Sequence, residues 1–93
     1  MAKKRITFRF EDKAATSVAV AGTFNAWLPD AFFLKKDKGG VWSGVKMLAP
    51  GRYEYRFVIN GDRWMADPGA AEQTNNEFGA QNSVLIVPGV IPQ

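Results

Sequence analysis

The stretch Gly51-Arg-Tyr-Glu-Tyr-Arg-Phe-Val-Ile-Asn-Gly-Asp-Arg-Trp64 decides the fold that this chain is expected to adopt. From Tyr53 to Ile59 a face of aromatic and β-branched residues alternates with a face that carries Arg56, which is the pattern of a strand with one buried side. Asn60-Gly61 predicts a two-residue hairpin turn, because both positions need a positive φ that Asn and Gly tolerate. The chain should therefore turn back here, and residues 62–65 should pair antiparallel with this strand.

Short alternating segments on either side of this hairpin predict further strands. We expect them at residues 5–10, 17–21, 31–36, 41–48 and 83–87, separated by turns that contain glycine, proline or polar residues. In the segment 31–36 either Phe32 or Phe33 should be buried. The nearly continuous apolar run of 83–87 predicts a strand that is buried on both sides or lies at the centre of a sheet. Residues 69–81 are mostly small and polar, and we interpret them as a long surface loop.

Seven or eight short strands in a chain of 93 residues favour an all-β, immunoglobulin-like sandwich of antiparallel strands. No linker or repeat divides the chain, so we expect a single domain over residues 1–93, with a core from about residue 4 to residue 88 and a frayed end at 90–93. The initiating Met and the absence of a linker favour a free-standing small protein, and an origin as part of a larger protein stays open as the alternative.

The composition excludes several classes of function. The chain has no cysteine and no histidine, which rules out a thiol nucleophile, a disulfide framework, a Cys/His zinc site and histidine acid–base catalysis. The nine carboxylates stand mostly beside turns and no serine lies in a nucleophile elbow, so we expect no enzyme, no cofactor and no metal site. No apolar run approaches the ~20 residues of a membrane helix. The cationic start is not followed by the apolar segment of a secretory signal, and a cytoplasmic protein without membrane contact is expected.

The net charge is +3, and two runs, Lys3-Lys4-Arg5 and the segment 35–38, supply six of the twelve cations. A nucleic-acid interface would place such cations among exposed aromatic residues on one face. Here the first run lies at a terminus and the second precedes two glycines at an expected hairpin tip. We therefore expect no nucleic-acid partner.

The tryptophans are the residues most suited to binding. Trp27 lies in a loop and Trp64 follows the hairpin tip, and neither belongs to an alternating apolar set that would carry it into the core. An indole that stacks on the apolar face of a sugar ring gains ~2.5 kcal/mol before ordering costs. Arg56 should leave the core on the face that Trp64 shares and can bond adjacent hydroxyls, and the amide of Asn82 offers both donor and acceptor. The alternative is structural, because a loop tryptophan often plugs the end of a sandwich; we assign Trp42 to this structural class.

Four sequence blocks, which occur in order between residues 18 and 87, together resemble the family-48 carbohydrate-binding modules. The blocks are Gly22-Thr-Phe-Asn-Ala-Trp27, Gly51-x-Tyr-Glu-Tyr-Arg-Phe-Val-Ile-Asn-Gly61, Trp64-x-x-Asp67-Pro68 and Asn76-x-x-Gly79-x-x-Asn82-Ser-Val. These modules are the isoamylase early-set domains, and they include the glycogen-binding domain of the AMP-activated kinase β subunit. The resemblance implies a β-sandwich that binds α-1,4-linked glucans such as glycogen, starch and maltooligosaccharides without catalysis.

The resemblance also implies which residues make the site: Trp27, Arg56, Trp64 and Asn82. Phe78 stands where the kinase-type domains have an apolar residue that reaches through the sugar, and it is expected to act likewise. Arg56 replaces a lysine common in the family, and Ala80 replaces a hydroxyl residue, which removes one hydrogen bond. Some early-set domains serve instead as structural or protein-interaction modules without sugar binding. The resemblance also leaves open a glycogen-metabolising enzyme or a kinase-type protein as a partner.

Overall fold

A computed structural model describes residues 2–89, so the frayed end expected at 90–93 lies outside the described residues. Within residues 2–89 no helix is long and apolar enough to cross a membrane. The described elements are β1 (Lys4–Glu11), β2 (Val18–Gly22), the 3-10 helix η1 (Thr23–Asn25), β3 (Lys35–Lys36), β4 (Val41–Leu48), β5 (Gly51–Ile59), β6 (Arg63–Met65), β7 (Glu72–Asn75) and β8 (Gln81–Val87).

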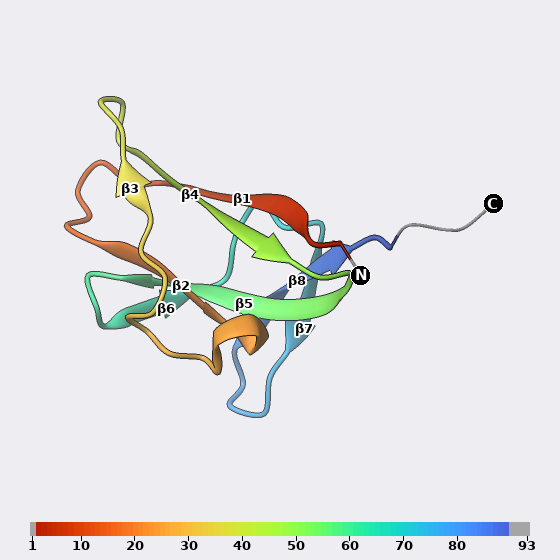
Figure 1. Cartoon of the computed structure of the whole chain (residues 1–93). Coiled ribbons are helices and arrows are strands. Elements are labelled where there is room, and N and C mark those ends of the chain that lie inside the picture. The colour runs from red at the N-terminus through yellow and green to blue at the C-terminus, as the bar shows by residue number, and fades with distance from the viewer. Residues whose placement is uncertain (1, 90–93) are drawn as a thin grey trace.

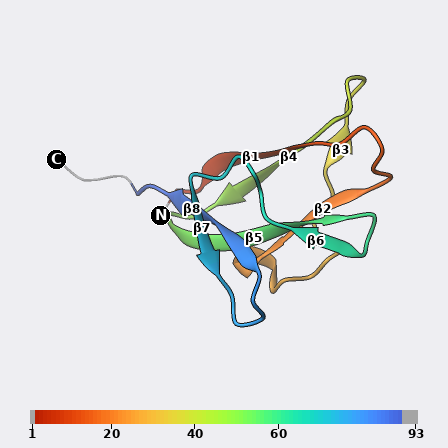
Figure 2. The same ribbon diagram turned by 180° about the vertical axis from the view of Figure 1, so that it is seen from behind.

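These strands form two antiparallel sheets packed face to face (Figure 1). One sheet has the order β1-β4-β3. The other has the order β2-β5-β8-β7, and β6 also pairs with β5. β8 pairs with the first half of β5 and β6 with its last three residues, as the reverse view makes clear (Figure 2). The expected all-β sandwich is confirmed.

The core lies between the sheets and is built from the alternation seen in the sequence. Tyr55 and Phe57 of β5 are buried and meet Phe8 and Phe10 of β1. The rings of Phe10 and Phe57 have centroids 4.9 Å apart, and those of Phe8 and Tyr55 are 5.1 Å apart in an edge-to-face arrangement. Such aromatic pairs add to the free energy gained from burying apolar area, and they connect the two sheets.

The β5–β6 hairpin has the expected turn residues but one more residue than predicted. Asn60 and Gly61 have φ of 57° and 79°. Ile59 pairs with Arg63, so the loop has three residues, and the prediction of a two-residue turn is wrong. The Asn60 side-chain oxygen accepts hydrogen bonds from the N–H (2.7 Å) and hydroxyl (3.0 Å) of Thr16, which holds the longer tip against the segment before β2.

The third loop residue decides where Trp64 points. A two-residue turn would pair Trp64 with Phe57 and direct the indole into the core, because a one-residue shift in register exchanges the faces of a strand. The observed register pairs Trp64 with Val58 and so keeps it on the face of Arg56. The turn length and the shared face expected from the sequence were therefore incompatible, and the structure keeps the shared face.

The interpretation of residues 69–81 as a loop is wrong, because β7 lies within them and pairs with β8. β7 is an edge strand of four polar residues held by main-chain hydrogen bonds, so it lacks the apolar alternation that would identify it. β8 lies inside the sheet, between β5 and β7, as expected. It is not buried on both sides, since Ile86 is 57% exposed.

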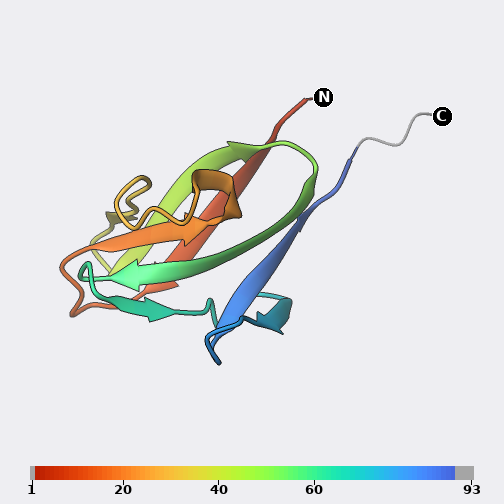
Figure 3. The ribbon, with the colours of Figure 1, turned by 90° about the horizontal axis from the view of Figure 1, so that it is seen from below.

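The strand expected at 31–36 is also shorter than predicted. The segment first lies against β2, where Phe33 forms an isolated bridge with Ala19, and then pairs with β4 only at Lys35–Lys36. It crosses from one sheet to the other, which prevents one continuous strand (Figure 3, orange to yellow). Phe32 packs against the core, whereas Phe33 is exposed.

Replacement of Phe57 by Ala should destabilise the fold by ~3–5 kcal/mol, because it removes a fully buried ring that packs on Phe10 and Tyr55. The free energy of unfolding, measured by urea denaturation, tests this. The matched control is Ile86→Ala, which truncates an exposed residue of the same sheet and should change stability by less than ~0.5 kcal/mol. Equal losses in the two variants would contradict the assignment of the core.

Candidate functional site

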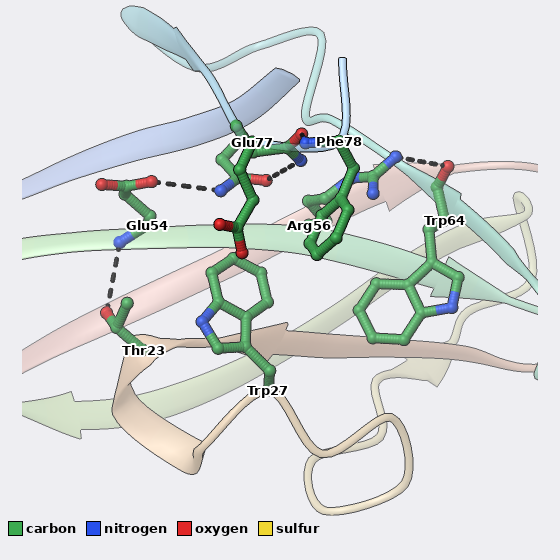
Figure 4. A pocket seen from close by; sticks show the side chains of 9 residues that line it. Thr23, Trp27, Glu54, Arg56, Trp64, Glu77 and Phe78 are labelled. Carbon is green, nitrogen blue, oxygen red and sulfur yellow. Dashed lines mark hydrogen bonds between the residues drawn. The ribbon is translucent and has the colours of Figure 1, made fainter. Parts of the chain in front are cut away.

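A groove of about 510 Å³ lies on the outer face of the five-stranded sheet (Figure 4). Five of the residues that line it are those expected from the sequence, and they come from the loop after β2, from β5, β6 and β8, and from the β7–β8 loop: Trp27, Arg56, Trp64, Asn82 and Phe78. The lining is completed by four polar residues, Thr23, Glu54, Asn76 and Glu77. Segments far apart in the sequence thus meet at one surface.

The floor beside this groove is made of small apolar residues. Ala19 and Ala21 of β2 and Val58 of β5 are buried in a cluster separate from the main core, and Trp27 and Trp64 pack against it. Neither tryptophan lies in the main core, although both pack on this separate cluster. Each indole is half-buried on this cluster and also lines the groove, so it combines a structural contact with an accessible surface.

The loop that carries Trp27 is fixed by its first residues. A Cβ on Gly22 would lie 2.6 Å from the carbonyl oxygen of Glu54, so only glycine fits against β5 there. The side-chain oxygen of Asn25 accepts a hydrogen bond from the N–H of Gly22 at 3.0 Å, and its amide donates to the main chain of β2. Ala26 and Trp27 have φ of 58° and 60°, which costs energy in non-glycine residues. The Trp27 N–H donates to the Gly22 carbonyl at 2.9 Å, and these bonds together hold the strained turn.

Arg56 is held beside the second indole. Its Nη2 donates to the carbonyl oxygen of Trp64 at 3.0 Å, and its Cζ lies 6.0 Å from the centre of the Trp64 ring. Its Nε is buried and has no acceptor among residues 2–89. A guanidinium has five N–H donors, of which this bond uses one. Arg56 is half-buried, and its hydrogen bond holds the guanidinium beside the Trp64 ring. It therefore contributes more to the stability of the fold than an exposed arginine would.

Asn82 is 7% exposed and lies in the middle of a chain of hydrogen bonds. Its Nδ2 donates to Oε1 of Glu54 at 3.1 Å, and its Oδ1 accepts from Nδ2 of Asn76 at 3.2 Å. The Asn76 Oδ1 in turn accepts from the N–H groups of Phe78 (2.9 Å) and Ala80 (3.0 Å). This chain connects β5, through β8, to the loop that presents Phe78 over the groove.

Sequence reasoning did not assign Glu54, Asn76, Glu77 or Thr23 to the site. For Glu54 a signal existed, because alternation places it on the face of Arg56. The role of Asn76 depends on the course of the β7–β8 loop, which the sequence pattern did not reveal. Thr23 accepts a hydrogen bond from the Glu54 N–H at 3.2 Å and so connects the Trp27 loop to β5.

The electrostatics of the groove are mixed in sign. The amide of Asn82 and the guanidinium of Arg52, 2.7 Å from the Glu54 carboxylate, hold the pKa of Glu54 below its usual value. Two carboxylates, those of Glu54 and Glu77, and one cation, Arg56, are among the residues that line the groove. Figure 4 shows Phe78, which is 85% exposed, between the two indoles. Such a surface suits a neutral polar ligand that has flat apolar faces.

Two conspicuous sequence features lie outside the groove and serve the fold. Trp42 is buried, and its ring N–H donates to the carbonyl of Asp12 at 2.9 Å, in agreement with its assignment to structure. Asp67, of the Asp-Pro block, accepts a hydrogen bond from the Tyr55 hydroxyl at 2.6 Å, and its N–H donates to Ser83 at 2.6 Å. Burial and the neighbouring carboxylate raise the pKa of Tyr55.

In the described part of the chain no group of three or more acidic, Cys or His side chains is placed to hold a metal ion.

The depressed pKa of Glu54 predicts a specific dependence of stability on pH. Its ionised form is favoured by folding, so its contribution is present above about pH 4.5 and is lost as the pH falls through the lower folded pKa. Glu54→Gln keeps an acceptor for Asn82 but does not titrate. Urea unfolding from pH 7 to pH 3 should therefore show a smaller acid loss in this variant than in the wild type. Asp37, whose pKa is also lowered, titrates in both proteins, so identical acid losses would contradict this role of Glu54.

Comparison with known proteins shows the family to which the chain is similar. Residues 4–90 match a family model described as the glycogen recognition site of AMP-activated protein kinase. The chain is 34% identical over 74 residues to protein PTST homolog 2, chloroplastic, of Arabidopsis thaliana, which covers 80% of this chain and 13% of that protein. It is 33% identical over 73 residues to protein FLOURY ENDOSPERM 6, chloroplastic, of Oryza sativa subsp. japonica, with 78% and 13% covered.

These comparisons correct one expectation and leave others untested. The expected cytoplasmic location is contradicted, because both relatives are chloroplastic proteins by name. The chain spans about 13% of the length of these curated relatives, and the single domain over residues 1–93 stays a prediction. The family model covers most of the chain, and the resemblance stated from the sequence is confirmed. The chain is a carbohydrate-binding module of the family that contains the glycogen recognition site of AMP-activated protein kinase.

Proposed function

We propose that this module binds α-1,4-linked glucans, such as glycogen, starch and maltooligosaccharides, without catalysing a reaction on them. The observation that carries the proposal is the pair of indoles, Trp27 and Trp64, which line one groove and rest on a common floor. Their packing orders the rings before a ligand arrives, which lowers the entropy cost of binding. Sugar rings would stack on the two indoles.

The polar lining supports the same ligand. Arg56 has N–H donors beyond the one given to Trp64, and the amide of Asn82 keeps a second N–H and a second lone pair. These groups would bond sugar hydroxyls, while Phe78 would cover the ring faces from the opposite side. With ~2.5 kcal/mol per stacked ring before ordering costs, the expected dissociation constants range from about millimolar to micromolar.

A neutral ligand fits the groove better than a nucleic acid. Recognition of phosphates requires clustered cations that release counterions. The two cationic runs of the sequence, at residues 3–5 and 35–38, contribute nothing to the lining, whereas Glu54 and Glu77 do.

The Glu54 carboxylate supports a non-catalytic role. A glycoside hydrolase needs one carboxylic acid with a raised pKa to protonate the leaving group. Glu54 is bonded to Asn82 and Arg52, and its pKa is lowered. It is therefore poorly suited to act as a general acid.

A structural or protein-docking module is the alternative function. The chloroplastic relatives are far longer than this chain, and their location favours a plastid location for this protein. A glycogen-metabolising enzyme or a kinase-type protein remains a predicted partner there. Docking alone would leave the module without affinity for glucans. Native gels cast with glycogen or with dextran separate the two functions, because only the proposed function retards the protein in glycogen.

Trp27→Ala and Trp64→Ala should each weaken binding of β-cyclodextrin by about tenfold or more, since each removes one stacking surface. Isothermal calorimetry measures the affinity. Each ring also packs against the cluster of Ala19, Ala21 and Val58, so a modest fall in stability is expected, and circular dichroism should confirm that the variants remain folded. Folded variants that both bind as tightly as the wild type would sink the stacking proposal.

Arg56→Ala should reduce glucan affinity by ~0.5–1.5 kcal/mol, the size of a hydrogen bond. Arg63→Ala is the matched control, because Arg63 precedes Trp64 but lies on the other face, where it pairs with Asp12 at 3.3 Å. This control should bind like the wild type in calorimetry with maltoheptaose. The reverse ranking of the two variants would mean that the glucan lies on the opposite face of the sheet.

A further inference from the structure

Phe33 lies on the same face of the sheet as the groove, although it does not line the groove. It pairs with Ala19, Ala19 pairs with Val58, and Val58 pairs with Trp64, so these four residues form one line across the sheet. Directly opposed residues of antiparallel strands point to the same side. The flanking residues agree, because Leu34 is buried in the core and Phe32 packs against it.

The backbone that carries Phe33 is fixed, and its side chain is open to solvent. The N–H of Val20 donates to the Phe32 carbonyl at 2.9 Å, and the N–H of Leu34 donates to the Val18 carbonyl at 2.8 Å. Phe33 is nevertheless 54% exposed. An exposed ring on a backbone that is fixed by hydrogen bonds is pre-organised to contact a ligand.

Apolar residues, against whose cluster the two indoles pack, separate Phe33 from Trp64. Ala19 and Val58 are the residues between them, and both are 1% exposed. Three strand spacings of ~4.8 Å place the backbones of Phe33 and Trp64 about 14 Å apart. A ligand that covers this distance must be an oligosaccharide longer than one that fills the groove alone.

We infer that Phe33 is a further aromatic platform, which extends the binding face beyond the groove and favours longer glucan chains. This inference rests on the proposed function. The occupant is the same neutral glucan rather than a second protein, because the Phe33 line is continuous with the floor on which both groove tryptophans pack. A chain that stacks on Trp64 can continue along this face of the sheet and reach Phe33.

The test compares a short and a long ligand, maltotriose and maltoheptaose, by calorimetry. Phe33→Ala should bind maltotriose like the wild type and maltoheptaose about three- to tenfold more weakly, since only the longer chain covers the ring. Phe33→Tyr keeps a flat ring and should retain the wild-type affinity for both. The matched control is Met47→Ala, which truncates a 49% exposed residue of β4 on the other sheet and should change neither affinity.

The outcomes separate this inference from the proposed function. If the wild type binds neither ligand, the proposed function fails. If the wild type binds and Phe33→Ala binds maltoheptaose equally well, or loses affinity equally for both ligands, the inference is overturned. Should Phe33→Ala unfold, Phe33→Leu keeps an apolar side chain without a flat ring, and the same selective loss is expected of it.

Discussion

Strand β5 pairs with three neighbours at once, and its register with each of them determines both the core and the groove. Its aromatic residues on one side fill the space between the sheets. On the other side Glu54, Arg56 and Val58 meet Ala21 and Ala19 of β2 and Trp64 of β6. Because side chains alternate with period two, any slip of one residue would exchange these faces. The main-chain hydrogen bonds of β5 therefore stabilise the fold and also place the groove residues on one face.

The groove shows how a flat sheet can hold a binding surface without a deep cavity. Ala19 and Ala21 have small side chains, and the two indoles pack against them and Val58. Loops add the remaining parts, and each is tied back to the sheet by a side-chain amide, Asn25 for the Trp27 loop and Asn76 for the Phe78 loop. An amide suits this position because it has both donors and acceptors for main-chain groups.

Several groove residues contribute to stability as well as to the surface. The indoles pack against the apolar cluster of β2 and β5, Arg56 bonds the main chain at Trp64, and Asn82 bonds Glu54. Such contacts keep the side chains in one conformation, so little conformational entropy remains to be lost when a ligand binds. Because the same side chains serve folding and binding, a substitution here is expected to lower both the free energy of unfolding and the affinity for the ligand.

The sequence by itself determined the sandwich, its core face and the central hairpin, because strict alternation and turn residues act locally along the chain. It also brought forward Trp27, Arg56, Trp64, Phe78 and Asn82, all of which line the groove, although their roles remain to be tested. Only the tertiary structure revealed β7, whose polar residues show no pattern, and the partial burial of the tryptophans on Ala19 and Val58. It also decided the face of Trp64, because the β5–β6 loop has three residues rather than two. The tip of this loop is held by hydrogen bonds between Asn60 and Thr16, which are 44 residues apart in the sequence. Pairing between distant segments sets such features, and no local pattern encodes it.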